Sequence, residues 1–260
     1  MLRSIWTSRS ALNANQERLN VISNNLANSS TTSYKREDVG FKDLLNETLD
    51  RRGYPLEDKK ADMGTGVRVT NWYKNYNQGV IIATGTNTDL CLESITETAF
   101  FRVFNTQGEA LYTRDGSFKI DMQGNIVDSN GYRLELQYEE GINPEEVNFR
   151  NKDIKINEVG EITIKQGEQY VKVAKINTYT STGNQAFRSI GDSYYLPNEG
   201  AEIRVATDTI MHQGALEASN VDMAQEITDM ILTQRAFQLN TKGLETADEM
   251  WGMINNMSSR

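Results

Sequence analysis

Histidine and cysteine are nearly missing from this chain of 260 residues, which holds one of each. A single cysteine, Cys91, excludes an internal disulfide, and we expect it to lie buried in a strand as a small apolar residue. A single histidine, His212, excludes most histidine-based zinc sites and leaves a Ser-His-Asp arrangement with one candidate base. We therefore expect no catalytic residue, no metal site and no cofactor.

Long apolar runs and clustered basic residues are also missing. No segment reaches the roughly 20 apolar residues of a membrane-spanning helix, so we expect no membrane span. The opening MLRSIWTSRSALN lacks a continuous apolar stretch with a small-residue cleavage site, which predicts that the protein has no cleaved signal peptide. A net charge of -9 argues against nucleic acid as a partner, because phosphate contacts need clustered Lys and Arg.

What the sequence does contain is a seven-residue apolar repeat at each end, typical of a helix with one apolar stripe. At both ends a companion track is mostly polar. Before the second repeat, the S-x-x-D spacing of Ser219 and Asp222 favours a helix start. The apolar tracks are Ile5, Leu12, Leu19 and Leu26, and Met223, Met230, Phe237, Leu244 and Trp251. The companion tracks are Leu2, Arg9, Gln16 and Ser23, and Ile227, Gln234, Thr241 and Asp248.

The first repeat runs into ISNNLANSSTTSYKRE, residues 22–37, which is rich in Asn, Ser and Thr but has no Gly or Pro. Such side chains bond nearby backbone groups, so we expect them to end the helix locally. The same segment would remain able to adapt to a neighbouring molecule. We expect Asn24, Asn25 and Asn28 to take part in contacts between subunits.

The middle of the chain changes period. Residues 100–136 alternate short β-rich runs with turns such as Asp115-Gly116 and Asn130-Gly131, which predicts antiparallel hairpins. The predicted fold is α+β, in which long N- and C-terminal helices pair as an antiparallel coiled coil around an inserted, mostly antiparallel β domain. The expected domains are an N-terminal helix (1–28), a polar connector and loop (29–65), a β-rich outer domain (66–212) and a C-terminal helix (213–260).

An antiparallel arrangement would bring the two apolar tracks together. Full burial of the nine track residues would contribute roughly 1.5 to 3 kcal/mol each. This contribution cannot offset the backbone entropy that some 60 residues lose when they become ordered, at about 1 kcal/mol or more apiece. One hypothesis is that the helices are marginal in the monomer and become ordered when copies stack. The alternative is a helix pair packed inside an ordinary domain. The expected pairs are Ile5–Trp251, Leu12–Leu244, Leu19–Phe237 and Leu26–Met230.

Both ends also carry family motifs. The stretch SNNLANSSTTSYKRE resembles the N-N-L-A-N-x-x-T-x-G-[FY]-K motif of bacterial flagellar rod and hook proteins, with Ser33 in place of the usual glycine. SNVDMAQEITDMILTQRAFQLNTKGLETADEM is similar to the end motif of that family, and GTGVR and YTRDGSF also fit. Within the family, MLRSIWT and GTGVR are most similar to the distal-rod branch. A segment at Glu93 to Phe101, ESITETAFF, departs from the family by lacking its glycines.

The resemblance implies a structural subunit of the flagellar basal-body rod. Its terminal helices would form the inner coiled-coil layer of a helical polymer that acts as a tubular drive shaft and transmits torque from motor to hook. Its implied partners are copies of itself, other rod and hook subunits and the flagellar type III export apparatus. The N-terminal assembly candidates are Ile5, Leu12, Leu19, Asn24, Asn25, Leu26, Asn28, Thr31, Tyr34 and Lys35. The C-terminal candidates are Met223, Ile227, Met230, Gln234, Arg235, Phe237, Asn240, Leu244, Asp248 and Trp251.

Other functions have weaker support in the sequence. The acidic pairs Glu139-Glu140 and Glu145-Glu146 flank Pro144 and fit a solvated loop better than an acid/base pair. GTGVR is not followed by GK[ST], so it is only a weak signal for a nucleotide loop. Three alternatives remain: a proximal-rod or hook subunit, a secreted binding module, and a wall-active hydrolase.

Overall fold

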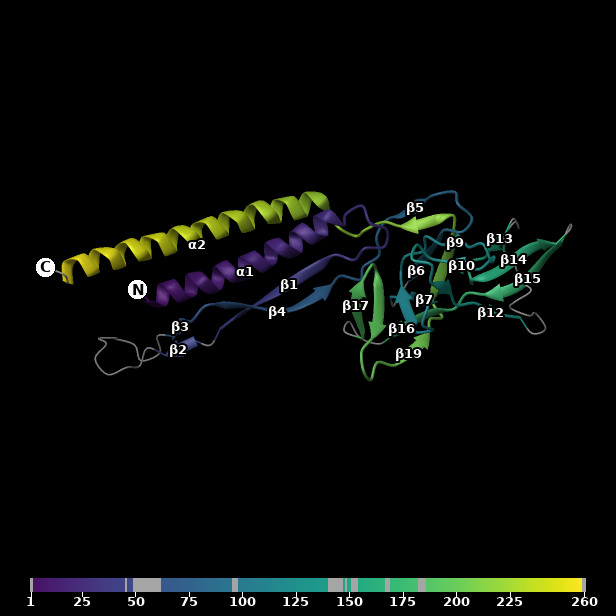
Figure 1. Ribbon diagram of the computed structural model, residues 1–260, viewed down its shortest axis with the longest axis horizontal. Coiled ribbons are helices and arrows are strands. Elements are labelled where there is room, and N and C mark those ends of the chain that lie inside the picture. Colours follow the sequence, from purple (N-terminus) through teal and green to yellow (C-terminus); the bar gives the residue numbers. More distant parts are fainter. Residues whose placement is uncertain are drawn as a thin grey trace. The chain divides into compact units, whose positions relative to one another are not determined.

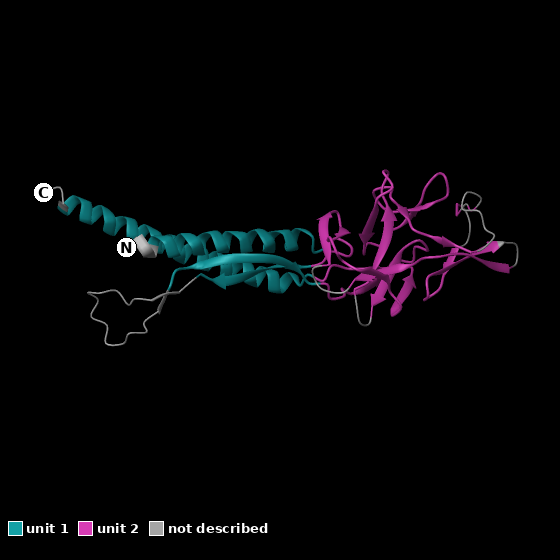
Figure 2. Ribbon diagram, turned by 90° about the horizontal axis from the view of Figure 1, so that it is seen from below, with its two compact units in different colours: residues 1–29, 36–75, 221–260 teal, residues 30–35, 76–220 magenta. Residues whose placement is uncertain are grey.

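The computed structural model describes residues 2–44, 46–48, 62–94, 98–139, 147, 149–150, 154–166, 169–181 and 186–258. The chain forms two compact units, coloured separately in Figure 2. Unit 1 contains residues 1–29, 36–75 and 221–260, and unit 2 contains residues 30–35 and 76–220. Each unit is therefore built from segments that are far apart in the sequence.

Unit 1 contains both long helices in the described part of the chain, α1 (Leu2–Ala27) and α2 (Met223–Ser258). They lie side by side and run in opposite directions (Figure 1). Asp222 caps α2, because its Oδ1 accepts hydrogen bonds from the backbone N of Ala224 at 2.9 Å and of Gln225 at 3.2 Å. A helix start near the predicted signal is confirmed, but Asp222 is the capping residue in place of Ser219, and α2 begins at Met223.

The polar stretch after α1 ends that helix as the sequence predicts. Asn28 Nδ2 donates to the Asn24 carbonyl at 2.9 Å, and Ser29 Oγ donates to the Leu26 carbonyl at 2.9 Å. The backbone N of Asn28 and of Ser29 donates to the same two carbonyl groups, so each residue bonds the end of α1 through both its backbone and its side chain.

A two-stranded ribbon completes unit 1. Strand β1 (Glu37–Asp43) pairs antiparallel with β4 (Val67–Lys74), with an irregularity between Val39 and Phe41, and both strands contact α1. The short strands β2 (Asn46–Thr48) and β3 (Asp62–Gly64) also pair. The expectation of a plain connector at 29–65 is therefore wrong for these strands. Pairing with β4, about 30 residues away, stabilises a segment whose own pattern is weak.

Unit 2 is built from antiparallel strands, as the sequence predicts. Within the described residues, its largest sheet has nine strands, in the order β17-β18-β8-β7-β11-β10-β9, with β16 on β7 and β19 on β16. A second sheet has the order β12-β15-β14-β13, and two further pairs are β20 with β6 and β21 with β5. The strands of the largest sheet are β7 (Phe100–Phe104), β8 (Ala110–Thr113), β9 (Lys119–Ile120), β10 (Ile126–Val127), β11 (Arg133–Leu134), β16 (Thr178–Ser181), β17 (Phe187–Gly191), β18 (Tyr194–Pro197) and β19 (Ile203–Val205). The others are β5 (Ile81–Ala83), β6 (Leu90–Ser94), β12 (Gln137–Tyr138), β13 (Ile154–Ile156), β14 (Glu161–Gln166), β15 (Gln169–Lys175), β20 (Thr209–Gln213) and β21 (Ala215–Glu217).

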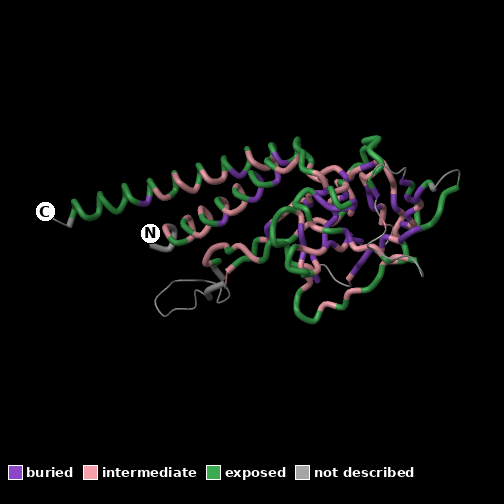
Figure 3. Tube along the Cα trace, turned by 45° about the vertical axis from the view of Figure 1, so that its right-hand side comes forward, coloured by how far each residue is buried: buried purple, intermediate pink, exposed green. Residues whose placement is uncertain are grey.

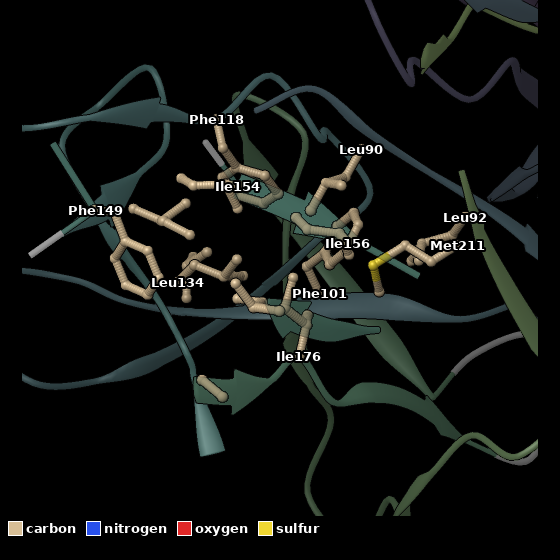
Figure 4. Packing of buried hydrophobic residues seen from close by; sticks show 14 of the residues in the cluster. Leu90, Leu92, Phe101, Phe118, Leu134, Phe149, Ile154, Ile156, Ile176 and Met211 are labelled. Atoms are coloured by element: carbon tan, nitrogen blue, oxygen red, sulfur yellow. The ribbon is translucent and has the colours of Figure 1, made fainter. Parts of the chain in front are cut away.

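The main hydrophobic core of the described chain lies in unit 2. Phe101 and Phe118 meet edge to face, with ring centroids 5.2 Å apart, and Leu90, Ile156 and Met211 pack around them (Figure 4). A second, aromatic cluster consists of Phe100, Tyr112, Tyr179 and Tyr195, with Tyr76, Phe187 and Ile203 packed against it. The strands of unit 2 thus supply their own core without the helices.

Strands occupy part of the region expected to be C-terminal helix. β20 and β21 lie within residues 209–217, and α2 begins only at Met223. No helix in the described part of the chain is long and apolar enough to span a membrane.

Candidate assembly surface

The contact between the two helices follows a seven-residue spacing on α2. Glu226, Thr233 and Ala247 are buried, and Met230, Phe237 and Leu244 are half-buried. On α1 the buried residues are Ala14, Val21, Ile22 and Asn25, while the predicted track Ile5, Leu12, Leu19 and Leu26 is half-buried. The covered seam therefore contains polar as well as apolar side chains.

One contact and one close approach define the register of the helices. Asn25 Nδ2 lies 3.2 Å from Glu226 Oε2, and Gly243 lies opposite Ser8, since a Cβ added to this glycine would be 3.7 Å from Ser8 Oγ. Asn25 and Ser8 are seventeen residues apart on α1, and their partners are seventeen residues apart on α2. The expected register, which placed Leu26 opposite Met230, is wrong by about five residues. A seven-residue pattern is compatible with several registers, and the polar contact between Asn25 and Glu226 selects one.

Asn25 is the centre of a buried polar cluster in unit 1. Its Nδ2 donates to the Glu37 carbonyl at 2.8 Å, and its Oδ1 accepts from the Glu37 backbone N at 2.9 Å. Glu226, which is 0% exposed, also accepts from Arg36 Nε at 2.5 Å. The cluster ties the end of α1 to the start of α2 and to the first residue of β1.

Lys35 is the centre of a second buried cluster, in unit 2. Its Nζ donates to Glu217 Oε1 at 2.6 Å and to the Asn77 carbonyl at 2.9 Å. Arg114 Nε donates to Glu217 Oε2 at 2.6 Å, and the Gly79 backbone N donates to Glu217 Oε1 at 2.7 Å. Two cations therefore share one buried carboxylate.

The charges in this cluster shift one another's ionisation. Burial lowers the pKa of Lys35 to about 8, and the neighbouring Arg114 charge acts in the same direction. Burial raises the pKa of Glu217, but Arg114 and Lys35 outweigh that effect and its pKa lies below the ordinary value. Burial, with the Glu217 charge, raises the pKa of Cys91 to about 11. Cys91 is a buried residue of β6, as predicted, and its thiol is unreactive at neutral pH.

The remaining N-terminal assembly candidates lie closer to the surface. Asn24 and Thr31 are exposed, and Leu26, Asn28 and Tyr34 are half-buried. Lys35 and Asn25 are each 1% exposed, because they bond within the chain. The motif therefore contains side chains that bond within the chain and other side chains that are accessible at the surface.

Most C-terminal candidates lie on the surface of α2 (Figure 3). Met223 is 53% exposed, Ile227 43% and Trp251 47%, while Met230, Phe237, Asn240 and Leu244 are half-buried. Gln234, Arg235 and Asp248 are exposed. Large apolar side chains in such numbers on one helix indicate a face that another molecule covers.

Sequence reasoning did not single out several residues of the polar clusters. Arg36 and Arg114 lie within or next to the motifs, whereas Glu217 stands just before the C-terminal motif in a segment expected to be helical. The one available signal was charge: Lys35 and Arg114 lie inside the motifs, and a cation that becomes buried needs a carboxylate partner.

No group of His, Cys, Asp or Glu suited to a metal ion occurs among the described residues. His212 Nε2 lies 2.7 Å from Glu93 Oε2, on the neighbouring strands β20 and β6, and both side chains are partly exposed. Of the acidic pairs, Glu139 bonds Lys172, and the other three glutamates lie outside the described residues.

Three family models match the chain. They are Flagella basal body rod protein at residues 5–35, Flagellar hook protein FlgE/F/G D1 domain at 94–164 and Flagellar basal body rod FlgEFG protein C-terminal at 212–257. The chain is 33% identical to "Flagellar basal-body rod protein FlgG" of Buchnera aphidicola (subsp. Schizaphis graminum), over 99% of this chain and 100% of that protein. It is 30% identical to FlgG of Borreliella burgdorferi, over 99% of each chain. It is also 30% identical to "Flagellar hook-basal body complex protein FlhP" of Bacillus subtilis, over 99% of this chain and 100% of that protein.

Proposed function

The chain belongs to the family of flagellar basal-body rod proteins, and on that premise we propose that its subunits polymerise through their terminal helices into the tubular shaft that transmits torque from motor to hook. Its role in the basal body is structural and not enzymatic, as the sequence predicts. The finer proposal is the mode of assembly: α1 and α2 pair as an antiparallel coiled coil, and copies of that pair stack.

The observation that carries the proposal is the exposed apolar surface of α2. Ile231, Leu232 and Leu239 are 53%, 61% and 71% exposed, although each is large and apolar. At about 25 cal/mol per Å² of apolar surface removed from water, covering such residues drives association. The seven-residue spacing of the seam with α1 supports the coiled-coil pairing.

The family implies assembly with other flagellar rod and hook subunits. We propose copies of the same chain as the first partner, because the uncovered face recurs on every copy. Delivery by the flagellar type III export apparatus, without a cleaved signal peptide, follows from the family resemblance and is part of the same proposal. The proximal-rod or hook alternative, the binding module and the hydrolase each lack an observation that favours them over the distal rod.

The test is assembly of the full chain. Sedimentation across a concentration series, with electron microscopy of the pellet, should show polymers above a critical concentration. Hydrogen exchange should be fast in α1 and α2 of dilute monomer and slow in the polymer, because packing against copies orders the helices. Absence of polymer at every concentration, together with slow exchange in the monomer, would contradict the proposal.

A further inference from the structure

A second seven-residue track runs along α2 on a face that no described residue of its own chain covers. Leu232, Leu239 and Met253 are 61%, 71% and 58% exposed, and the exposed Thr246 occupies the intervening position. These residues are distinct from the seam residues Glu226, Thr233 and Ala247, which share the same period on another face. α2 therefore has two seven-residue tracks, of which one is covered by α1.

The charges of α2 divide along its length. Residues 232–244, called the basic segment here, carry Arg235 and Lys242 and no acidic residue. Residues 245–258, called the acidic end, carry Glu245, Asp248 and Glu249 and no basic residue. All five charged side chains are exposed, and none has an ion-pair partner in the described part of the chain.

The acidic end also extends past the helix that covers the rest of α2. In the observed register, the first residue of α1, Leu2, lies level with Glu249. Figure 1 shows α2 continuing beyond that point. There Trp251, Ile254 and Met257 are 47%, 48% and 80% exposed, so apolar groups point outward around the helix.

We propose that the acidic end of α2 in one copy docks in parallel on the basic segment of α2 in a second copy, displaced by two seven-residue repeats. This inference rests on the proposed function and specifies which surfaces meet. A displacement of fourteen residues, about 21 Å at 1.5 Å per residue, places Glu249 level with Arg235, Met253 with Leu239, and Thr246 with Leu232. The Glu249 carboxylate then faces the Arg235 guanidinium, and Met253 meets Leu239 along the track.

The geometry favours an open chain of copies. The contact joins two different segments, so each docked copy still offers a free basic segment and a free acidic end. Methionine suits the acidic end, because its flexible thioether adapts to the leucine track of the neighbour. A lipid surface is a weaker occupant, since Glu245, Asp248 and Glu249 oppose an anionic membrane.

The experiment uses charge reversal in the full chain. One variant is Arg235→Glu with Lys242→Glu, and the other is Glu245→Lys with Glu249→Lys. Either should raise the critical concentration for polymer at least about tenfold, because like charges then face each other. An equimolar mixture of the two variants should also recover, because in an alternating chain the acidic end of the first variant meets the basic segment of the second, and the reversed end of the second meets the reversed segment of the first. The four changes combined in one chain should return the critical concentration to within about threefold of the unmodified protein.

Two further measurements separate the possible failures. Lys119→Glu, on an exposed lysine of unit 2, is the matched control and should polymerise normally. In polymers containing both Leu239→Cys and Met253→Cys chains, oxidation should link the two cysteines between copies. An antiparallel contact would place Met253 near Ile231 instead, and would end at dimers.

If the unmodified chain polymerises but the reversals have no effect, or the combined variant does not recover, this inference is overturned and the proposed function stands. If the unmodified chain does not polymerise at any concentration, the proposed function itself is contradicted. Binding of monomer to vesicles of anionic lipid without polymer would identify a membrane as the occupant and would also overturn the inference.

Discussion

Lys35 and Glu217, 182 positions apart in the sequence, form an ion pair at 2.6 Å in which each side chain is 1% exposed. Arg114 shares the same carboxylate at 2.6 Å, so the cluster contains one more positive than negative charge. Lys35 of the N-terminal motif therefore forms its ion pair within unit 2, and the Glu217 carboxylate is the counter-charge of two buried cations.

Replacement of Glu217 should be severely destabilising. Glu217→Gln leaves Lys35 and Arg114 buried without a counter-charge, and we expect unit 2 to lose about 3 to 5 kcal/mol of unfolding free energy. Urea denaturation monitored by tyrosine fluorescence measures the loss. Glu199→Gln, at an exposed position, is the matched control and should change stability by less than about 0.5 kcal/mol. If Glu217→Gln and Glu199→Gln lowered the unfolding free energy equally, the stabilising role of Glu217 in the buried cluster would be contradicted.

The lowered pKa of Lys35 predicts a dependence of stability on pH. The folded chain releases the Lys35 proton near its pKa of about 8, whereas the unfolded chain holds it up to the ordinary value of 10.5. Between these pH values the unfolded state binds more protons, so the Lys35 contribution makes stability rise with pH. Comparison of the unmodified chain with Lys35→Met from pH 7.5 to 10 isolates this contribution, which should favour the unmodified chain increasingly, by up to about 2 to 3 kcal/mol. A constant difference would show that Lys35 keeps an ordinary pKa.

Two neighbouring asparagines of the same motif should behave differently. Asn25→Ala removes the paired bonds to the Glu37 backbone and the bond to Glu226, and should cost about 2 to 4 kcal/mol by leaving buried polar groups unsatisfied. Asn24→Ala changes an exposed side chain and should cost less than about 1 kcal/mol. Hydrogen exchange at the C-terminal turns of α1, measured in the polymer where the helices are ordered, reports both. Similar exchange in the two variants would contradict the assigned role of Asn25.

Ser33 occupies the position where the family motif has glycine, and its φ of 56° is left-handed. Its Oγ donates to the Arg114 carbonyl at 2.8 Å, which offsets the backbone strain. Ser33→Gly should therefore leave stability within about 1 kcal/mol, because it relieves strain and loses one hydrogen bond. Ser33→Ala keeps the strain and loses the bond, so it should be destabilised by about 1 to 2 kcal/mol more than Ser33→Gly. Thermal melting of the two variants side by side distinguishes them.

The helices and hairpins could be predicted because their patterns are local. Seven-residue spacing, the cap at Asp222 and the polar stop at Asn28 and Ser29 each act within about one helical turn. Gly-containing turns such as Asn130-Gly131 likewise mark hairpins from adjacent residues, and φ at Gly131 is 81°.

Strand β1, the register of the helices and the role of Glu217 could not be predicted, because they depend on residues far apart in the sequence. Strand β1 owes its conformation to β4, and the helix register depends on Asn25 reaching Glu226, 201 positions away. The pattern of apolar residues alone favoured a register about five residues away, since it contains no information on which buried polar groups match. The role of Glu217 could not be predicted for the same reason, because it depends on Lys35 and Arg114, which only the fold brings next to it.

The contact between Asn25 and Glu226 also fixes a dimension. If the two helices slipped by one turn, about 5.4 Å, Glu226 would be buried without Asn25 and Arg36, at a cost that no apolar gain along the seam would match. In every copy, α1 and α2 therefore have the same position relative to each other along their axes. In a shaft built from many copies, small differences in the position of the helix ends would add up along the axis. The buried contact between the Asn25 amide and the Glu226 carboxylate keeps that position the same in every copy.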